Sequence, residues 1–458
     1  MDFDLRGLLA ERGREGYELY GKYLNPQQPK TLHTIGFDKI YTRAEGAYLY
    51  DKDGNRYTDF LAGFGVFAAG RNHPVIRKAL HDALDLELAE WTQFDCQPLP
   101  GLLAERLLAK APGLERVFFC NSGTEAVESA LKFARYATGR GRVIYCDHAF
   151  HGLTAGSLSI NGSKEFRKGF GPLLPDTVIP LGDIDALAAE LKRGDVAALI
   201  IEPIQGKGVH MPPDGFLTAA AKLLHENGAL LICDEIQCGF GRTGKFFAYQ
   251  HEADVQPDIV TVAKALSGGY VPVGAMLAKG WIFEKVFSSQ DRVMVHSTTF
   301  KAGTMAMVAG LASLHVLETE GLTENAAKTG AALSTALQTL AQKYDVLADV
   351  RGRGLMIGLE FDKPGSLRAR ANWKMLQAAR VGLFSQTLVV ALFQRHRILT
   401  QVSADFMEVI KLIPPLMISE EDVKAFADAF GEVLEDASKG SGLMLDFGRT
   451  LAKQAIKR

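Results

Sequence analysis

The sequence predicts an α/β protein with a large domain and a small one. The large domain is expected to surround a mostly parallel central sheet covered by helices on both faces, and the small α+β domain to combine both termini. The middle of the chain alternates short apolar runs with helical patterns, and glycines stand at the ends of the apolar runs. Both ends of the chain depart from this alternation. Continuous apolar strands that alternate with helices are typical of a parallel sheet buried on both faces.

Five apolar runs in the middle of the chain are predicted strands, at residues 116–120, 142–146, 197–201, 229–233 and 258–262. Helical patterns at residues 124–137 and 215–226 lie between them. The first 60 residues predict a helix and then short strands around a DKDGNRY turn, and beyond about residue 320 long helices flank the segment VRGRGLMIGLEF. We therefore expect a large domain at 61–325 and a small domain from 1–60 and 326–458.

Composition excludes several classes of protein. The formal net charge is −2, whereas nucleic-acid binding requires a basic surplus. The longest apolar stretch, residues 381–393, is shorter than the ~20 residues of a membrane span. The N-terminal 21 residues predict a charged amphipathic helix, not a signal peptide. Five cysteines, four of them in apolar runs, indicate buried thiols, so we expect a soluble cytoplasmic protein.

The C-terminal segment GLMLDFGRTLAKQAIKR predicts an amphipathic helix with basic residues at its end. We expect it to pack on the small domain or on a dimer partner. Contact with a membrane surface is the less favoured alternative, because only a few basic residues are involved.

Polar or aromatic groups follow all five predicted strands. In chain order these groups are NSGTE at 121–125, DHAFHG at 147–152, EPIQG at 202–206, DEIQ at 234–237 and AKALSGG at 263–269. Ligands of open α/β sheets bind beyond the carboxyl ends of the strands. We therefore expect one ligand site at this edge of the sheet.

Two of these groups fit an anionic or ring-shaped ligand. Ser122, Gly123 and Thr124 begin a predicted helix, where free N–H groups favour a phosphate, although the same residues also fit plain helix capping. Asp234 ends an apolar strand, where a carboxylate is costly unless it is paired. A protonated pyridine nitrogen would be a fitting partner, and capping of the next turn is the alternative.

Lys264 follows an apolar strand and precedes a glycine-rich turn. A partly desolvated lysine has a lowered pKa and can form a Schiff base, whereas a strand-end lysine in solvent would do neither. Phe150 can stack on a ring or belong to the core. Asp147, His148 and His151 have no further ligand close by in the sequence, so we expect no metal site.

Together the motifs resemble the class III pyridoxal-phosphate-dependent aminotransferases, the ornithine, acetylornithine, GABA and putrescine aminotransferases and the omega-transaminases. The resemblance rests on NSGTEAVESALKFAR, AFHG, EPIQG, DEIQCGFGRTGKFFA, DIVTVAKALSGGYVPVGA and HSTTF, in this order between about residues 40 and 420. It implies the type I aminotransferase fold, a homodimer with active sites at the interface, and ping-pong transamination. Donors would be amines or amino acids, and acceptors would be keto acids or aldehydes.

The resemblance also implies residue roles. Lys264 would form the Schiff base and move the substrate proton, and Asp234 would pair with the pyridine nitrogen. Further cofactor contacts are implied for Gln237 at the phenolic oxygen, Phe150 on the ring face, Glu202 as an acceptor near the ring, Ser122, Gly123 and Thr124 at the phosphate, and Thr299 of the partner subunit at the same phosphate.

Two positions depart from the family pattern. Lys207 stands where many members have the glutamate of EPIQGEGG, and Lys411 stands where many have an arginine before LxPPL. A lysine cannot make the bidentate fork of an arginine on a carboxylate. With the nearby Phe64 and Trp91, these positions suggest a substrate whose terminal amine sits on a hydrophobic or extended chain. The alternative is that the apolar residues belong to the core or the dimer interface.

Other functions remain as alternatives. Aminomutases, racemases and decarboxylases use the same type of cofactor site. A cofactor-binding regulator or an inactive paralogue is disfavoured, because Lys264, Asp234 and Gln237 are all present. A nucleotide-binding protein would require a Walker-type loop or a GxGxxG loop directly after a strand. No Walker-type loop is found, and the match GFGRTG at 239–244 does not directly follow a predicted strand.

Overall fold

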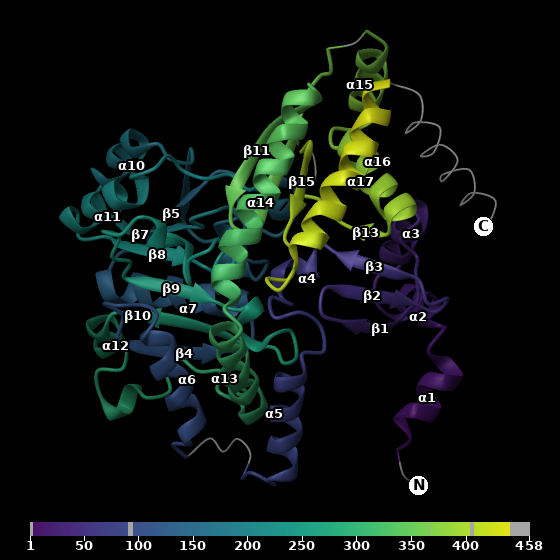
Figure 1. Ribbon diagram of the computed structural model, residues 1–458. Helices are drawn as coiled ribbons and strands as arrows, with labels where there is room; N and C mark the ends of the chain where they lie inside the picture. The colour runs from purple at the N-terminus through teal and green to yellow at the C-terminus, as the bar shows by residue number, and fades with distance from the viewer. Residues whose placement is uncertain (1–2, 90–94, 366, 404–406, 440–458) are drawn as a thin grey trace.

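The computed structural model describes residues 3–89, 95–365, 367–403 and 407–439. Its centre is a seven-stranded sheet in the order β4-β10-β9-β8-β7-β5-β6 (Figure 1). The strands are β4 Arg116–Cys120, β5 Arg142–Cys146, β6 Asp176–Ile179, β7 Val196–Ile201, β8 Leu230–Asp234, β9 Ile259–Val262 and β10 Gly274–Ala278. All neighbouring pairs are parallel except those that β10 makes with β4 and β9.

Alternating residues of the central strands enter two different hydrophobic clusters. Leu231 and Cys233 of β8 pack in one cluster with the helices α6 (Pro98–Leu108), α11 (Phe216–Glu226) and α13 (Thr304–Thr319). Leu230 and Ile232 of the same strand pack in the other with α7 (Gly123–Thr138) and α12 (Gly280–Val286). Helices therefore cover both faces of the sheet, which explains why its strands are apolar throughout.

Two smaller sheets join residues from both ends of the chain. The first consists of β1 Tyr41–Glu45, β2 Tyr48–Asp51 and β3 Arg56–Asp59, with β13 Ile398–Leu399 parallel to β3. The second has the order β11-β12-β15-β14, formed by Leu347–Arg353, Met356–Phe361, Val409–Leu412 and Gln401–Val402. The N-terminal strands thus lie beside C-terminal ones (Figure 1). The expected domain boundaries themselves stay a prediction.

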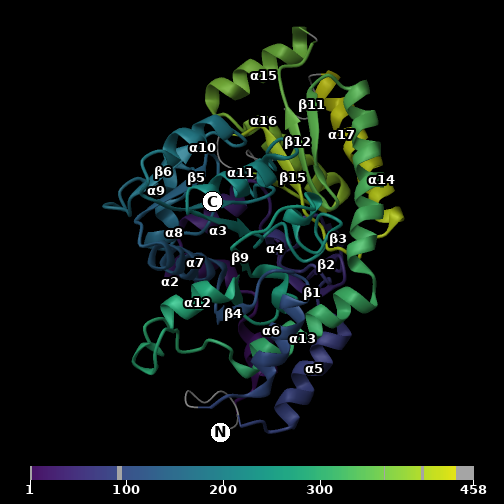
Figure 2. The ribbon, with the colours of Figure 1, turned by 90° about the vertical axis from the view of Figure 1, so that its left-hand side faces the viewer.

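Long helices accompany the C-terminal sheet. α14 (Leu322–Lys343) runs along one side of the molecule from α13 to β11 (Figure 2), and it also contacts α17 (Glu420–Lys439). Further helices are α3 Gln27–Thr34, α4 Ala62–Gly65, α5 Pro74–Asp85, α8 Ala155–Ser159, α9 Lys164–Arg167, α10 Ile184–Leu191, α15 Leu367–Ala379 and α16 Leu383–His396. The 3₁₀ turns include Ala248–His251, Lys264–Ser267 and Gln290–Arg292.

The structure confirms the five predicted strands and both helical patterns between them, to within one or two residues. One prediction was wrong: the N-terminal amphipathic helix is two helices, α1 (Leu5–Arg12) and α2 (Gly16–Tyr23), because a turn around Gly13 separates them. The predicted C-terminal helix lies outside the described residues. Among the described helices, none is long and apolar enough to cross a bilayer.

Candidate active site

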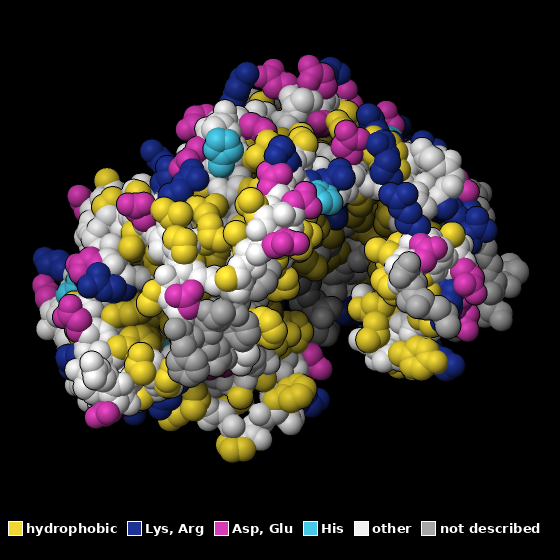
Figure 3. Space-filling model, turned by 90° about the horizontal axis from the view of Figure 1, so that it is seen from below, with side chains coloured by type: hydrophobic (Ala, Val, Ile, Leu, Met, Phe, Trp, Pro, Cys, Tyr) yellow, Lys and Arg dark blue, Asp and Glu magenta, His cyan; other side chains and the backbone are white. Residues whose placement is uncertain are grey.

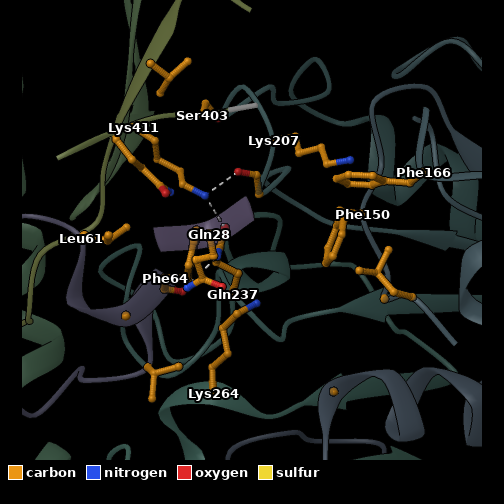
Figure 4. A pocket seen from close by; sticks show the side chains of 18 of the residues that line it. Gln28, Leu61, Phe64, Phe150, Phe166, Lys207, Gln237, Lys264, Ser403 and Lys411 are labelled. Carbon is orange, nitrogen blue, oxygen red and sulfur yellow. Dashed lines mark hydrogen bonds between the residues drawn. The ribbon is translucent and has the colours of Figure 1, made fainter. Parts of the chain in front are cut away.

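Lys264 lies directly after β9, at the start of a 3₁₀ turn, and its side chain lines the main cavity (Figure 4). Its backbone is left-handed, with a φ of 42°, which is unfavourable for a lysine. Burial lowers the pKa of its amine, and the carboxylates of Asp234 and Glu202 act in the opposite direction. A strained and desolvated lysine among carboxylates is typical of a functional site.

Asp234 ends β8 and is 3% exposed. Its Oδ1 accepts hydrogen bonds from Ile236 N at 3.1 Å and Thr261 Oγ1 at 3.0 Å. Its Oδ2 lies 2.7 Å from Nδ1 of the buried His151. Because a carboxylate accepts, Nδ1 of His151 donates to it. The sequence had singled out Asp234 but missed His151 as its partner, which the strand-end position of the histidine could have signalled.

The N-terminus of α7 opens onto the same cavity. Ser122 caps the helix, with its hydroxyl accepting from Glu125 N at 3.3 Å. Thr124 Oγ1 lies 2.7 Å from the hydroxyl oxygens of both Thr154 and Ser157. A Cβ on Gly123 would stand 3.0 Å from the Ile236 side chain, so glycine allows close packing at this turn. The free N–H groups of a helix start suit a phosphate.

Glu202 accepts hydrogen bonds from the segments that follow β5 and β7. Its Oε1 accepts from Phe150 N at 2.9 Å, and its Oε2 accepts from Gly206 N at 2.7 Å. Burial raises the pKa of the Glu202 carboxyl, with a further contribution from Asp234. The Nζ atom of Lys207 lies 4.9 Å from the ring centre of Phe150, so a cation–π contact borders the cavity.

Gln237 and Lys411 lie together on the cavity wall that faces Lys207 and Phe150 (Figure 4). Lys411 Nζ donates to Gln237 Oε1 at 3.0 Å, and Gln237 Nε2 donates to the carbonyl of Phe64 at 3.0 Å. Lys411 is 3% exposed, and burial lowers the pKa of its amine to about 7, with Lys264 as the next cause. Phe64 is 51% exposed and also borders the cavity.

The cavity has a volume of about 2190 Å³. It collects every predicted site residue except two. Trp91 lies outside the described residues, and Thr299 is exposed in a loop that does not line the cavity of its own chain. Sequence reasoning did not find the part of the cavity wall that comes from the N-terminal end of the chain, such as Gln28 of α3, because no local pattern relates this helix to the strand ends.

The described part of the chain shows no group of three His, Cys, Asp or Glu side chains suited to a metal ion. The residues at the cavity fit pyridoxal phosphate instead. A buried amine at Lys264, a buried carboxylate at Asp234 and the start of α7 offer partners for an aldehyde, a ring nitrogen and a phosphate. The tight turn at Gly123 would let backbone N–H groups approach the phosphate closely. Fold and site together define a pyridoxal-phosphate-dependent enzyme of the type I fold.

Comparison with known proteins gives the family. The class III aminotransferase model matches residues 33–434, so the chain belongs to this family of pyridoxal-phosphate-dependent aminotransferases. The aminotransferase PigE of Serratia sp. (strain ATCC 39006) is 36% identical over 453 residues, which cover 92% of this chain and 53% of that protein. The chain therefore spans about half the length of this relative.

Solved structures agree with the family. The ornithine aminotransferase of Toxoplasma gondii ME49 has a TM-score of 0.78 at 30% identity, with 88% of this chain and 91% of that chain covered. The omega transaminase of Pseudomonas jessenii, solved in complex with PMP, has a TM-score of 0.78 at 28% identity, with 88% and 94% covered.

Proposed function

We propose that this chain transfers an amino group from an amine or amino acid donor to a keto acid or aldehyde acceptor by a ping-pong mechanism, with Lys264 as the catalytic lysine. The observation that carries the proposal is the position of Lys264. Its buried amine faces one cavity together with Asp234 and the start of α7. Among the described residues, no hydrogen bond holds its Nζ atom in place, so the amine is available for covalent attachment and proton transfer.

Bound pyridoxal phosphate would supply the electron sink that makes the substrate C–H bond acidic. Once Lys264 is no longer linked to the cofactor, its Nζ atom would take the proton from the substrate carbon and deliver it to the cofactor. Burial favours the neutral amine that this step requires. Asp234 would keep a proton on the ring nitrogen, and the N–H of His151 holds the Asp234 carboxylate in place.

The donor is proposed to carry its amine at the end of a hydrophobic or extended chain. Apolar side chains from distant parts of the chain border the cavity, including Leu61, Val66, Leu383, Val389 and Leu399. Lys411 is already hydrogen-bonded to two groups of its own chain, which leaves little of it for a carboxylate. The solved relatives include ornithine aminotransferases and omega transaminases, so an ornithine-type donor is the alternative to test.

We also propose a homodimer in which Thr299 of the partner subunit completes the phosphate site. Exposed apolar side chains support this assembly: Leu84, Leu86, Val293, Met294 and Phe300 are each at least 60% exposed. On the lower face of the molecule, apolar side chains gather around a deep hollow (Figure 3). Apolar patches of this kind are typical of interfaces. Four buried, unpaired cysteines support a cytoplasmic location.

The test is an absorbance spectrum of the purified protein with pyridoxal phosphate, repeated with n-pentylamine and with ornithine. We expect a visible band that the amine bleaches and a keto acid restores. If ornithine bleached the band and pentylamine left it unchanged, the proposed transamination would stand and the proposed class of amine donor would be wrong. Product formation without any acceptor would favour an aminomutase or racemase, and a folded protein without the band would overturn the proposal.

A further inference from the structure

Lys411, Gln237, Gly206 and Phe64 form one hydrogen-bonded unit on the cavity wall. Figure 4 shows Lys411, Gln237 and Phe64 of this unit. Lys411 Nζ donates to Gly206 O at 2.7 Å and to Gln237 Oε1 at 3.0 Å. Gln237 Nε2 then donates to Phe64 O at 3.0 Å. Lys411 belongs to β15 of the C-terminal sheet, whereas Gly206 and Gln237 follow strands of the central sheet. The unit therefore links the two sheets at the cavity.

The chemistry of the two neighbours fixes the orientation of the Gln237 amide. A lysine ammonium can only donate, and a backbone carbonyl oxygen can only accept. Gln237 must therefore turn Oε1 toward Lys411 and its NH₂ group toward Phe64. Without Lys411, only the bond to the Phe64 carbonyl would hold the amide in this orientation, so the amide would be held less firmly.

The unit is packed too closely to rearrange easily. A Cβ on Gly206 would lie 2.6 Å from Gln237 Oε1, so the absence of a side chain lets the two segments meet. Phe64 has a φ of 63° in a run of left-handed residues from Ala62 to Gly65. Such a backbone persists only when its surroundings hold it, and the bond from Gln237 is one of these restraints.

We propose that Lys411 is a positioning residue, which holds the Gln237 amide in a single orientation beside Lys264 and thereby sets the ionisation of the bound cofactor. This inference rests on the proposed function, because Gln237 is the residue expected at the cofactor's phenolic oxygen. Lys411 thus makes its hydrogen bonds to groups of its own chain, and it affects the reaction through Gln237.

Charged groups face Lys411 from several elements. Burial lowers the pKa of its amine to about 7, and Lys264, Arg242 and Lys207 lower it further, whereas Glu202 raises it. Near and below that pH, Lys411 adds a positive charge to this wall. A nearby positive charge and a fixed hydrogen-bond donor both stabilise an anion. Removing Lys411 should therefore raise the pKa at which the cofactor's phenolic group and its lysine linkage titrate.

The experiment is a pH titration of the visible cofactor band in the holoenzyme. We expect Lys411→Met to raise the apparent pKa of the band by about one unit, within the range that a neighbouring charge commonly produces. Lys411→Arg, which keeps the charge and donates only, should return it toward the wild-type value. The control is Ser403→Ala, which removes the 2.6 Å bond from Gly208 N to Ser403 Oγ. This change loosens the loop after β7 that contains Gly206, and it leaves the bonds of Gln237 in place. This control should titrate as the wild type does.

A Gln237→Leu background separates positioning from direct charge. If Lys411 acts through Gln237, the shift caused by Lys411→Met should become smaller there. A full shift in that background, or no shift in Lys411→Met alone, would overturn the inference while the transaminase stands. A wild-type protein that does not bind the cofactor would overturn the proposed function first and this inference with it.

Discussion

Lys264 combines a buried amine with a left-handed backbone, two unfavourable features that the fold holds at one residue. We expect Lys264→Ala to lose at least about a thousandfold in kcat/KM, because acid–base groups contribute roughly 10²–10⁴-fold and the covalent link is lost as well. Borohydride reduction followed by intact mass should attach the cofactor to the wild type and not to this variant. The exposed Lys78→Ala on α5 serves as the control and should keep both properties. If the Lys264→Ala protein still gained the mass of the reduced cofactor, another lysine would have to carry the cofactor.

Lys411 gives a prediction for stability. Its pKa is about 7 in the folded protein, against 10.5 for a free lysine. Between these values the unfolded chain binds more protons, so this residue makes the folded state more stable as the pH rises from 7 toward 10.5, and least stable below pH 7. In thermal melts, the Tm of the wild type minus that of Lys411→Met should therefore increase as the pH is raised across this range. Parallel curves for the two proteins would contradict the lowered pKa.

At the scale of the element, the start of α7 depends on Gly123. A Cβ there would stand 3.0 Å from Ile236 and 3.4 Å from Ala263, and overpacking of this kind costs about 1–3 kcal/mol. Because relief of this contact would move the start of α7 out of place for the phosphate, we expect Gly123→Ala to weaken cofactor binding about tenfold, which corresponds to about 1.4 kcal/mol. Fluorescence titration of the apoprotein measures this affinity. Gly101→Ala in α6 is the matched control, because nothing lies within 4 Å of its Cβ, and an equal loss there would contradict the argument.

The elements also show what the sequence could predict. Strands β7 and β8 were predictable because they are apolar on both faces, and their polar endings marked the site. β6, with the sequence DTVI, is short and only partly buried, so it lacks that signal. The antiparallel direction of β10 arises from pairing across the sheet, which no local pattern shows. The bond between Lys411 and Gln237 escaped prediction for the same reason, since 174 positions separate the two residues.

At the scale of the whole molecule, the proposed dimer can be tested by complementation. If Thr299 serves the partner's site, Lys264→Ala and Thr299→Ala subunits form a mixed dimer with one doubly defective site and one intact site. We expect the co-expressed mixture to be more active than either variant alone, as measured by donor-dependent bleaching of the cofactor band. A mixture with only the average activity of the two variants would mean that Thr299 acts within its own chain or not at all.

The parallel pairing of β13 with β3 affects how the chain is synthesised. β3 ends at residue 59 and its partner begins at residue 398, so most of the polypeptide must leave the ribosome before this edge is covered. Until then, β1–β3 present an unpaired edge strand, which is a template for association with other chains. We infer that newly made protein passes through a long interval in which this hairpin region needs protection, and that slow or truncated synthesis favours aggregation at β3.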